Sequence, residues 1–190
     1  MKLSGSYQIN LEKQKVWDAL NDPNILQQAI PGCEEFKKDS ETKFIAKATN
    51  KIGPFNASFT GEVELKDLDP PNSYKITGSG NSPVGFASGE AKVKLEDSEG
   101  GTKLIYEVEA NVGGKIAQVG ARLIDMTAKK MADIFFGKFS ELISTKENLD
   151  TGNISTNINS NDTNKNNKIN KKLIYLVGVI AVLGILYFMI

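Results

Sequence analysis

The spacing of apolar residues changes its period once along this chain, and that change constrains the fold more than any other feature. From Glu34 to Val112 apolar and polar residues alternate in runs separated by Gly, Pro and Asn clusters, which is typical of half-buried β-strands joined by turns. After Gly113-Gly114 the spacing becomes helical for about 30 residues. Successive strands joined by short turns favour an antiparallel sheet with one buried face.

The helical stretch carries a single apolar stripe. Its members follow one another at intervals of three or four positions: Ala117, Gly120, Ile124, Ala128, Met131, Phe135, Phe139 and Leu142. Such a stripe needs an apolar surface to cover it, and the inner face of the sheet is the partner that the chain offers. The sequence therefore predicts an α+β domain in which a curved antiparallel β-sheet wraps around a long C-terminal α-helix.

Two shorter helices are predicted ahead of the sheet, after an opening strand. Residues 11–20 have helical spacing, and Trp17 belongs to their apolar stripe. Pro23 disfavours helix in the residue before it, so we expect this helix to end there. Residues 25–30 are predicted to form a second short helix. Together these elements make one domain over residues 1–143.

Large apolar side chains are predicted to point into the space between helix and sheet. They are Trp17, Phe55, Phe59, Phe86, Tyr106, Ile124, Met131 and Phe135. Glycines at positions 61, 78, 80, 85 and 89 would let the sheet bend and leave room where side chains are missing. Two interpretations stay open: a filled core, or a cavity lined by these residues that binds a hydrophobic small molecule.

The chain contains no histidine, which excludes the commonest kinds of active site. Ser-His-Asp and Cys-His nucleophiles, the HExxH zinc motif and most imidazole metal sites all require that residue. One cysteine excludes an internal disulfide and a multi-cysteine zinc site. Catalysis by a carboxylate, lysine or tyrosine remains open. We nevertheless expect no catalytic residue, no metal and no covalently bound cofactor.

Two local motifs receive structural interpretations. Gly113-Gly114-Lys115-Ile116 is not a phosphate-binding loop, because Ile116 stands where Ser or Thr is needed and Glu109 stands where the first glycine is needed. These glycines are better explained as the start of the helical region. Cys33 has no histidine to activate it, so we expect a small, buried or inert thiol.

Residues 173–190, LIYLVGVIAVLGILYFMI, are apolar and carry no charge. As a helix they would extend roughly 27 Å, close to the ~30 Å hydrocarbon core of a bilayer. Lys168, Lys171 and Lys172 lie just ahead, and the positive-inside rule then places the rest of the chain in the cytoplasm. The sequence predicts a single-pass, C-terminal transmembrane anchor on the cytoplasmic face of the membrane. The alternative is a buried core helix, which would lack a second apolar surface to cover it.

Between domain and anchor, residues 144–172 are rich in Asn, Ser, Thr and Lys, and we predict a disordered linker. The formal net charge of zero hides two opposite parts. Residues 1–150 contain 19 basic and 22 acidic residues, a balance of −3, whereas residues 151–190 contain 4 and 1, a balance of +3. A basic tail suits anionic head groups, while the balanced whole does not favour binding of nucleic acid.

Basic residues recur every seven positions along the helical stretch, at Lys115, Arg122 and Lys129. This spacing keeps them on one side of a helix. It predicts either a docking stripe for an acidic partner or for lipid head groups, or an ordinary solvated face opposite the apolar one.

Several blocks, in series, resemble the CoxG family of carbon monoxide dehydrogenase subunits. They span residues 1–142 and follow the family order: Trp17-Asp18-Ala19-Leu20-Asn21-Asp22-Pro23, Ile30-Pro31-Gly32-Cys33, Lys51-Ile52-Gly53-Pro54, Gly85-Phe86-Ala87-Ser88-Gly89, Gly113-Gly114-Lys115-Ile116-Ala117-Gln118-Val119-Gly120, Arg122-Leu123-Ile124 and Phe135-Phe136. A C-terminal membrane segment after a polar linker is also similar to members of that family.

The resemblance implies the START-like (SRPBCC) helix-grip fold, whose hallmark is an apolar cavity between the sheet and a long helix. It further implies a non-catalytic accessory role, in which the protein recruits a molybdenum hydroxylase of the carbon monoxide dehydrogenase type to the membrane. The cavity would then take a lipid-like quinone as electron acceptor. Because START-like domains bind many unrelated ligands, fold transfers better than function. The alternatives are a pure interaction tether with a filled core, or a START-like lipid-binding protein or enzyme unrelated to carbon monoxide.

Overall fold

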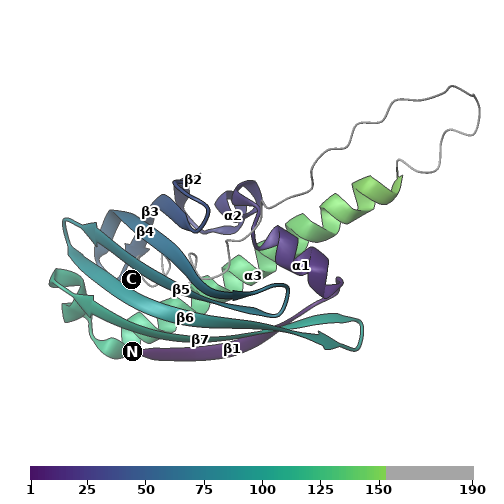
Figure 1. Cartoon of the computed structure of the whole chain (residues 1–190). Helices are drawn as coiled ribbons and strands as arrows, with labels where there is room; N and C mark the ends of the chain where they lie inside the picture. Colours follow the sequence, from purple (N-terminus) through teal and green to yellow (C-terminus); the bar gives the residue numbers. More distant parts are fainter. Residues whose placement is uncertain (153–190) are drawn as a thin grey trace, which may run out of the picture.

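The computed structural model describes residues 1–152 and shows a seven-stranded antiparallel sheet curved around one long helix (Figure 1). The strands are β1 (Lys2–Ile9), β2 (Cys33–Lys38), β3 (Lys43–Ile52), β4 (Phe55–Asp69), β5 (Ser73–Ser82), β6 (Gly85–Ser98) and β7 (Gly101–Gly113). The helices are α1 (Lys13–Ala19), α2 (Pro23–Ala29), the 3-10 helix η1 (Lys115–Val119) and α3 (Ala121–Gly152). The predicted α+β helix-grip architecture is confirmed for this part of the chain.

The sheet is a meander that the first strand extends. Its order is β1-β7-β6-β5-β4-β3-β2, so each strand from β2 to β7 pairs with its neighbour in sequence, and β1 adds to the edge of β7. Tight turns set the register: Ile52 pairs with Phe55 and Ser82 with Gly85. The predicted alternation on β4 is confirmed, because Phe59, Val63 and Leu65 are buried between exposed or half-buried polar residues.

The two short helices begin and end where local chemistry dictates. Pro23 ends the first helical region as expected, but it also occupies the first turn of α2, where its fixed φ is favourable and its missing N–H costs nothing. The carboxylate of Asp22 caps α2 by accepting a hydrogen bond from the Asn24 N–H at 3.0 Å. The second helix therefore starts two residues earlier than the predicted 25–30.

The C-terminal helical region is interrupted, which corrects the prediction of one continuous stripe. Gly114 (φ 86°) and Gly120 (φ 91°) bracket η1, and α3 starts only at Ala121. A 3-10 helix has three residues per turn, so its buried side chain is Ile116, while Ala117 and Gly120 are exposed. From Ile124 onward the predicted α-helical stripe is buried, apart from Leu142, which is half-buried.

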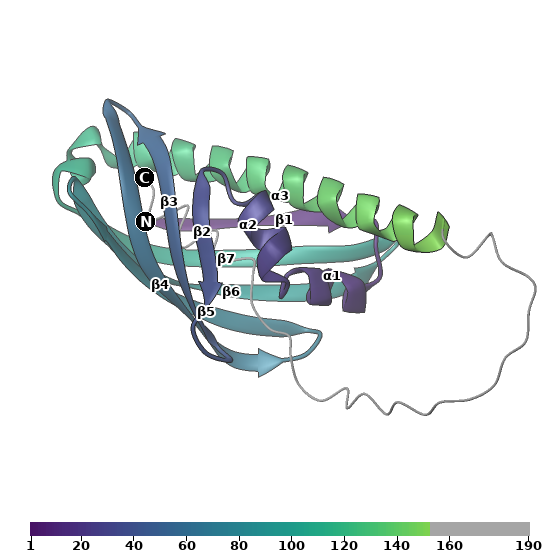
Figure 2. The ribbon, with the colours of Figure 1, turned by 90° about the horizontal axis from the view of Figure 1, so that it is seen from above.

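The core lies between the concave face of the sheet and one side of α3, whose other side faces away from the sheet (Figure 2). Phe135, Phe136 and Phe139 are almost completely buried there and contact one another through their rings. Trp17 of α1 adds a further buried ring, packed edge-on against Tyr74 of β5 with centroids 5.3 Å apart. Such aromatic pairs contribute ~1 kcal/mol beyond the area that they bury.

The C-terminal predictions fall mostly outside the described residues. Helix α3 continues to Gly152, so residues 144–152, predicted as linker, are helical. Residues 153–190, with the predicted anchor and its flanking Lys168, Lys171 and Lys172, lie beyond the described part. Within residues 1–152, no helix combines the length and apolar character needed to cross a membrane.

Candidate functional site

Most residues predicted to lie between helix and sheet are found there. Six of the eight are buried, with exposed fractions of 9% or less: Trp17, Phe59, Tyr106, Ile124, Met131 and Phe135. Phe55, at the first position of β4, is half-buried. Helix α1, strands β4 and β7, and helix α3 thus contribute to one apolar interior.

The inward orientation predicted for Phe86 is wrong, because 51% of this residue is exposed. On β6 the inward positions are Ala87, Ala91, Val93 and Leu95, and strand alternation places Phe86 on the outer face. Its ring lies over Gly113, the paired residue of β7, where a Cβ atom would stand 2.3 Å from the ring. The phase of the three later residues, extended backward, contained this information.

Glycine-rich segments that are distant in sequence meet at one end of the sheet. The turn between β5 and β6 contacts η1, since the Ile116 N–H donates to the Val84 carbonyl at 3.0 Å. Gly85 and Gly114 let the two backbones approach: a Cβ at Gly114 would lie 2.6 Å from the Gly85 Cα atom. Both glycines adopt positive φ, which other residues rarely do.

Two further segments join this end. A Cβ at Gly53, in the turn between β3 and β4, would lie 3.3 Å from Leu123 of α3. Beside it, the Asn50 side-chain amide donates to the Pro31 carbonyl at 2.9 Å. We call residues 30–33, 52–55, 82–86 and 113–123 the turn end of the domain. The blocks that carried the family resemblance after residue 30 are therefore largely one spatial feature.

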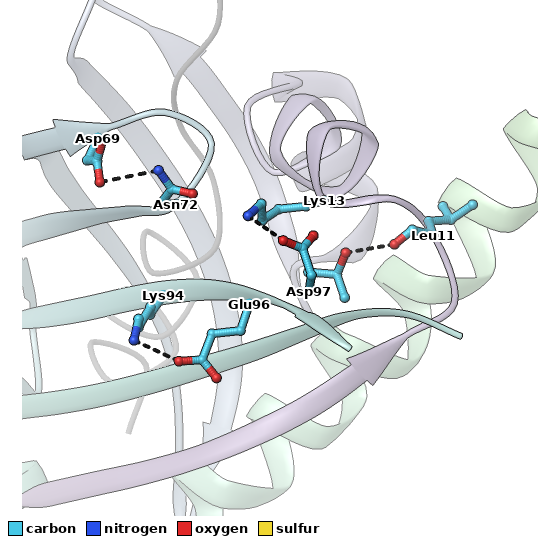
Figure 3. A network of polar contacts seen from close by, with 8 residues as sticks. Leu11, Lys13, Asp69, Asn72, Lys94, Glu96 and Asp97 are labelled. Carbon is cyan, nitrogen blue, oxygen red and sulfur yellow. Dashed lines mark hydrogen bonds and ion pairs between the residues drawn. The ribbon is translucent and has the colours of Figure 1, made fainter. Parts of the chain in front are cut away.

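The opposite end is closed by polar contacts rather than by glycines (Figure 3). Lys13 of α1 forms an ion pair with Asp97 of β6 at 2.8 Å. The Thr102 hydroxyl, fully buried, donates to the Leu11 carbonyl at 2.7 Å. These contacts hold α1 against the far ends of β6 and β7, which leaves the turn end as the candidate opening toward the apolar interior.

The predicted basic stripe is divided between two elements. Arg122 and Lys129 lie exposed on α3, whereas Lys115 belongs to η1, and the positive-φ Gly120 separates them. The seven-residue spacing therefore does not define one face of a single helix. The exposed side of α3 instead carries Leu123 (37% exposed), Met126 (61%) and Ile134 (44%), which the sequence reasoning missed.

A tyrosine pair lies where β1 meets α3. The Tyr7 hydroxyl donates to the Asp133 carboxylate, and the Tyr7 ring stacks on Phe136 with centroids 3.9 Å apart. Burial, and then the hydrogen bond to Asp133, raise the pKa of Tyr7 above its ordinary value. Burial likewise raises the pKa of Tyr106. Neither phenol would exchange a proton near neutral pH, so this pair serves packing and hydrogen bonding.

Other reactive groups are equally quiet. The Cys33 thiol donates to the Glu35 carbonyl at 3.4 Å, and burial raises its pKa to about 11, in keeping with the predicted inert thiol. Asn21 is buried, with 5% exposed; its amide donates to the Trp17 carbonyl, while its side-chain oxygen accepts no hydrogen bond. Among the described residues, no cluster of His, Cys, Asp and Glu could hold a metal ion.

The chain is similar to known proteins over this domain. The sequence profile of the CoxG family of carbon monoxide dehydrogenase subunits matches residues 5–144. A conserved protein from Geobacillus kaustophilus, solved by crystallography, is 30% identical; the match covers 76% of this chain and 96% of that one, with a TM-score of 0.73. The comparison with curated proteins finds no match.

More distant structures agree on the fold alone. A putative uncharacterized protein from Rhizobium leguminosarum is 14% identical over 76% of this chain and 95% of its own, with a TM-score of 0.58. Protein Ms6760 from Mycobacterium smegmatis is 15% identical over 76% and 92%, also with a TM-score of 0.58.

Proposed function

The chain belongs to the CoxG family of carbon monoxide dehydrogenase subunits, and from that premise we propose that it is a membrane-anchored, non-catalytic accessory protein whose domain binds a hydrophobic small molecule. Family membership supports the accessory role. The observation that carries the proposal is the match over residues 5–144 together with the assembly of the family's glycine blocks into one end of the sheet.

The ligand that we propose is a lipid-like quinone. Its isoprenoid tail needs an apolar sleeve, which the buried side chains of Phe59, Met131 and Phe135 would supply. Its head group needs only a few polar contacts. The turn end would admit the ligand, since glycines there leave backbone where side chains would otherwise stand.

The partner and the location follow the same premise. We propose that the protein recruits a molybdenum hydroxylase of the carbon monoxide dehydrogenase type to the cytoplasmic face of the membrane. Residues 173–190 would form the anchor, and Lys168, Lys171 and Lys172 would meet the head groups. The quinone would then accept electrons from the enzyme beside the membrane that stores it. Loss of residues 153–190 should release both protein and enzyme from sedimented membranes.

Trp17 offers a direct test of ligand binding, because it is the one tryptophan of the chain and is buried in the interior. A quinone bound nearby should quench its fluorescence in a saturable manner. Organic extraction of the purified protein, followed by mass spectrometry, should recover a quinone or lipid. Ala128→Phe would fill space on the inner side of α3 and should weaken quenching, whereas the exposed Met126→Gln should not.

A second candidate is a tether with a filled core, favoured by the close ring contacts among Phe135, Phe136 and Phe139. It predicts no extractable ligand and no saturable quenching of Trp17, while recruitment of the enzyme persists. That outcome would remove the ligand from the proposal and retain the accessory role. A START-like enzyme would instead turn over its ligand, which the same mass spectra would reveal as a product.

A further inference from the structure

We propose that the outward face of α3 is a lipid-binding surface that lays the helix on an anionic bilayer. We call this face the outer stripe and define it as Leu123, Met126, Lys130 and Ile134. The inference goes beyond the proposed function, because it requires neither a ligand in the core nor a partner enzyme. It commits the face that contains Arg122 and Lys129 to lipid.

The geometry of the stripe is that of an amphipathic helix lying in a membrane surface. Steps of three or four residues keep its members on one side of α3, opposite the buried Ala128, Ala132 and Phe135. The described chain has six large apolar side chains classed as exposed, and three of them are in this stripe. Figure 2 shows that this side of α3 faces away from the sheet. A helix buried on one side and apolar again on the other needs a second apolar partner.

Charge complementarity identifies that partner as an anionic surface. The exposed residues Arg122, Lys129 and Lys130 lie on or beside the stripe, and Lys138 follows one turn beyond Ile134. Asp125 and Asp133 are the acidic residues of the same stretch. Four basic against two acidic residues make this helix positive on a domain whose residues 1–150 have a net charge of −3. Apolar side chains between basic ones suit acyl chains beneath phosphate head groups.

The position of α3 in the chain supports the same partner. Residues 153–190 follow directly from its last described residue, Gly152, and contain the predicted anchor. A flexible chain of the length of residues 153–172 has an r.m.s. span of about 25 Å. The anchor would therefore keep α3 close to the bilayer, where a weak surface contact gains from high effective concentration.

Vesicle binding by residues 1–152 tests the stripe without the anchor. This part holds the complete sheet, core and α3, and the Geobacillus kaustophilus relative crystallised with 96% of its chain in the match. We expect it to sediment with vesicles of phosphatidylcholine and phosphatidylglycerol in equal parts, and at least tenfold less with phosphatidylcholine alone. Raising the salt concentration should weaken the binding, because salt screens exposed charges.

Two variants and their matched controls isolate the residues responsible. Met126→Gln with Ile134→Gln, or Arg122→Gln with Lys129→Gln and Lys130→Gln, should each lower the affinity for anionic vesicles at least fivefold. The controls change exposed residues elsewhere: Ile45→Gln with Leu68→Gln, and Lys38→Gln with Lys43→Gln and Lys103→Gln. Equal loss in variant and control would overturn the proposal, provided circular dichroism shows all of them folded.

The full-length chain provides a site-resolved measurement. With Cys33→Ser, the environment-sensitive dye NBD can be attached through Met126→Cys or, as a control, through Leu68→Cys. On anionic vesicles the emission at position 126 should shift to shorter wavelength, while that at position 68 stays as in water. No shift at position 126 would assign the outer stripe to a protein partner and overturn the proposal, whatever the extracted ligand proves to be.

Discussion

The hydroxyl of Tyr7 donates a hydrogen bond to the carboxylate of Asp133, which joins the edge strand β1 to the middle of α3 across 126 positions of sequence. The Tyr7 ring also stacks on Phe136, one turn further along the helix on its buried side. This contact matters for any ligand between helix and sheet, because β1 and α3 together form one wall of the interior.

Replacing Tyr7 by Phe should remove this hydrogen bond and keep the stack on Phe136. We expect the free energy of unfolding to fall by about 1 kcal/mol, the usual net value of one hydrogen bond. Urea unfolding followed by circular dichroism measures it. Ser6→Ala, on the exposed side of the same strand, is the control and should leave the midpoint unchanged. Equal midpoints for Tyr7→Phe and the parent chain would contradict the prediction.

Alkaline pH should destabilise the domain partly through the same residue. The folded state raises the pKa of Tyr7 above its ordinary value of 10, so it favours the protonated phenol. The resulting stability is fully present below about pH 10 and is lost progressively as the pH rises further. Between pH 9 and pH 11 the urea midpoint should fall more steeply for the parent chain than for Tyr7→Phe. Parallel curves would show that the phenol makes no such contribution.

Two glycines should respond to alanine with opposite signs. Gly114 has a φ of 86°, and its Cβ would lie 2.6 Å from the Gly85 Cα atom, so Gly114→Ala should destabilise by ~1–3 kcal/mol. Gly137 is in the interior of α3 with open space around it, so Gly137→Ala should stabilise by about 0.5–1 kcal/mol. Thermal unfolding of both variants measures the contrast. Similar melting temperatures would refute the proposed contact at the turn end.

Cys33 should react slowly with alkylating reagents. With its pKa raised to about 11 by burial, the fraction of reactive thiolate at pH 8 is on the order of a hundredfold below that of a free cysteine. Iodoacetamide labelling followed by mass spectrometry gives the rate, and unfolding in urea should restore ordinary reactivity. A folded-state rate equal to that of free cysteine would mean that the thiol is activated.

Local patterns predicted the elements well where each residue has a regular phase. The alternation at Phe59, Val63 and Leu65 correctly identified the buried face of β4, and the spacing from Ile124 to Phe139 correctly identified the buried side of α3. Phe86 was placed on the wrong face, because its size and its block, rather than its strand phase, guided the prediction. The break at Gly120 escaped notice, since small residues fit both a helical stripe and its interruption.

The candidate sites were less accessible to such reasoning. The hydrogen bond between Tyr7 and Asp133 joins residues with no local relation, and only strand pairing and helix packing bring them together. The outer stripe of α3 could have been read from the spacing of Leu123, Met126 and Ile134. The buried stripe on the opposite side is stronger, however, and a sequence does not say how many sides of a helix are covered.

The sequence by itself determined the fold class, the family and the exclusions of chemistry. Hydrophobic period, turn residues and the absence of histidine are local or compositional properties, independent of which strands pair. Tertiary structure alone decided that four glycine segments form one end of the sheet and that α3 keeps an apolar stripe facing outward. Both depend on strand register and helix orientation, which are set by the packing of the whole domain rather than by neighbouring residues.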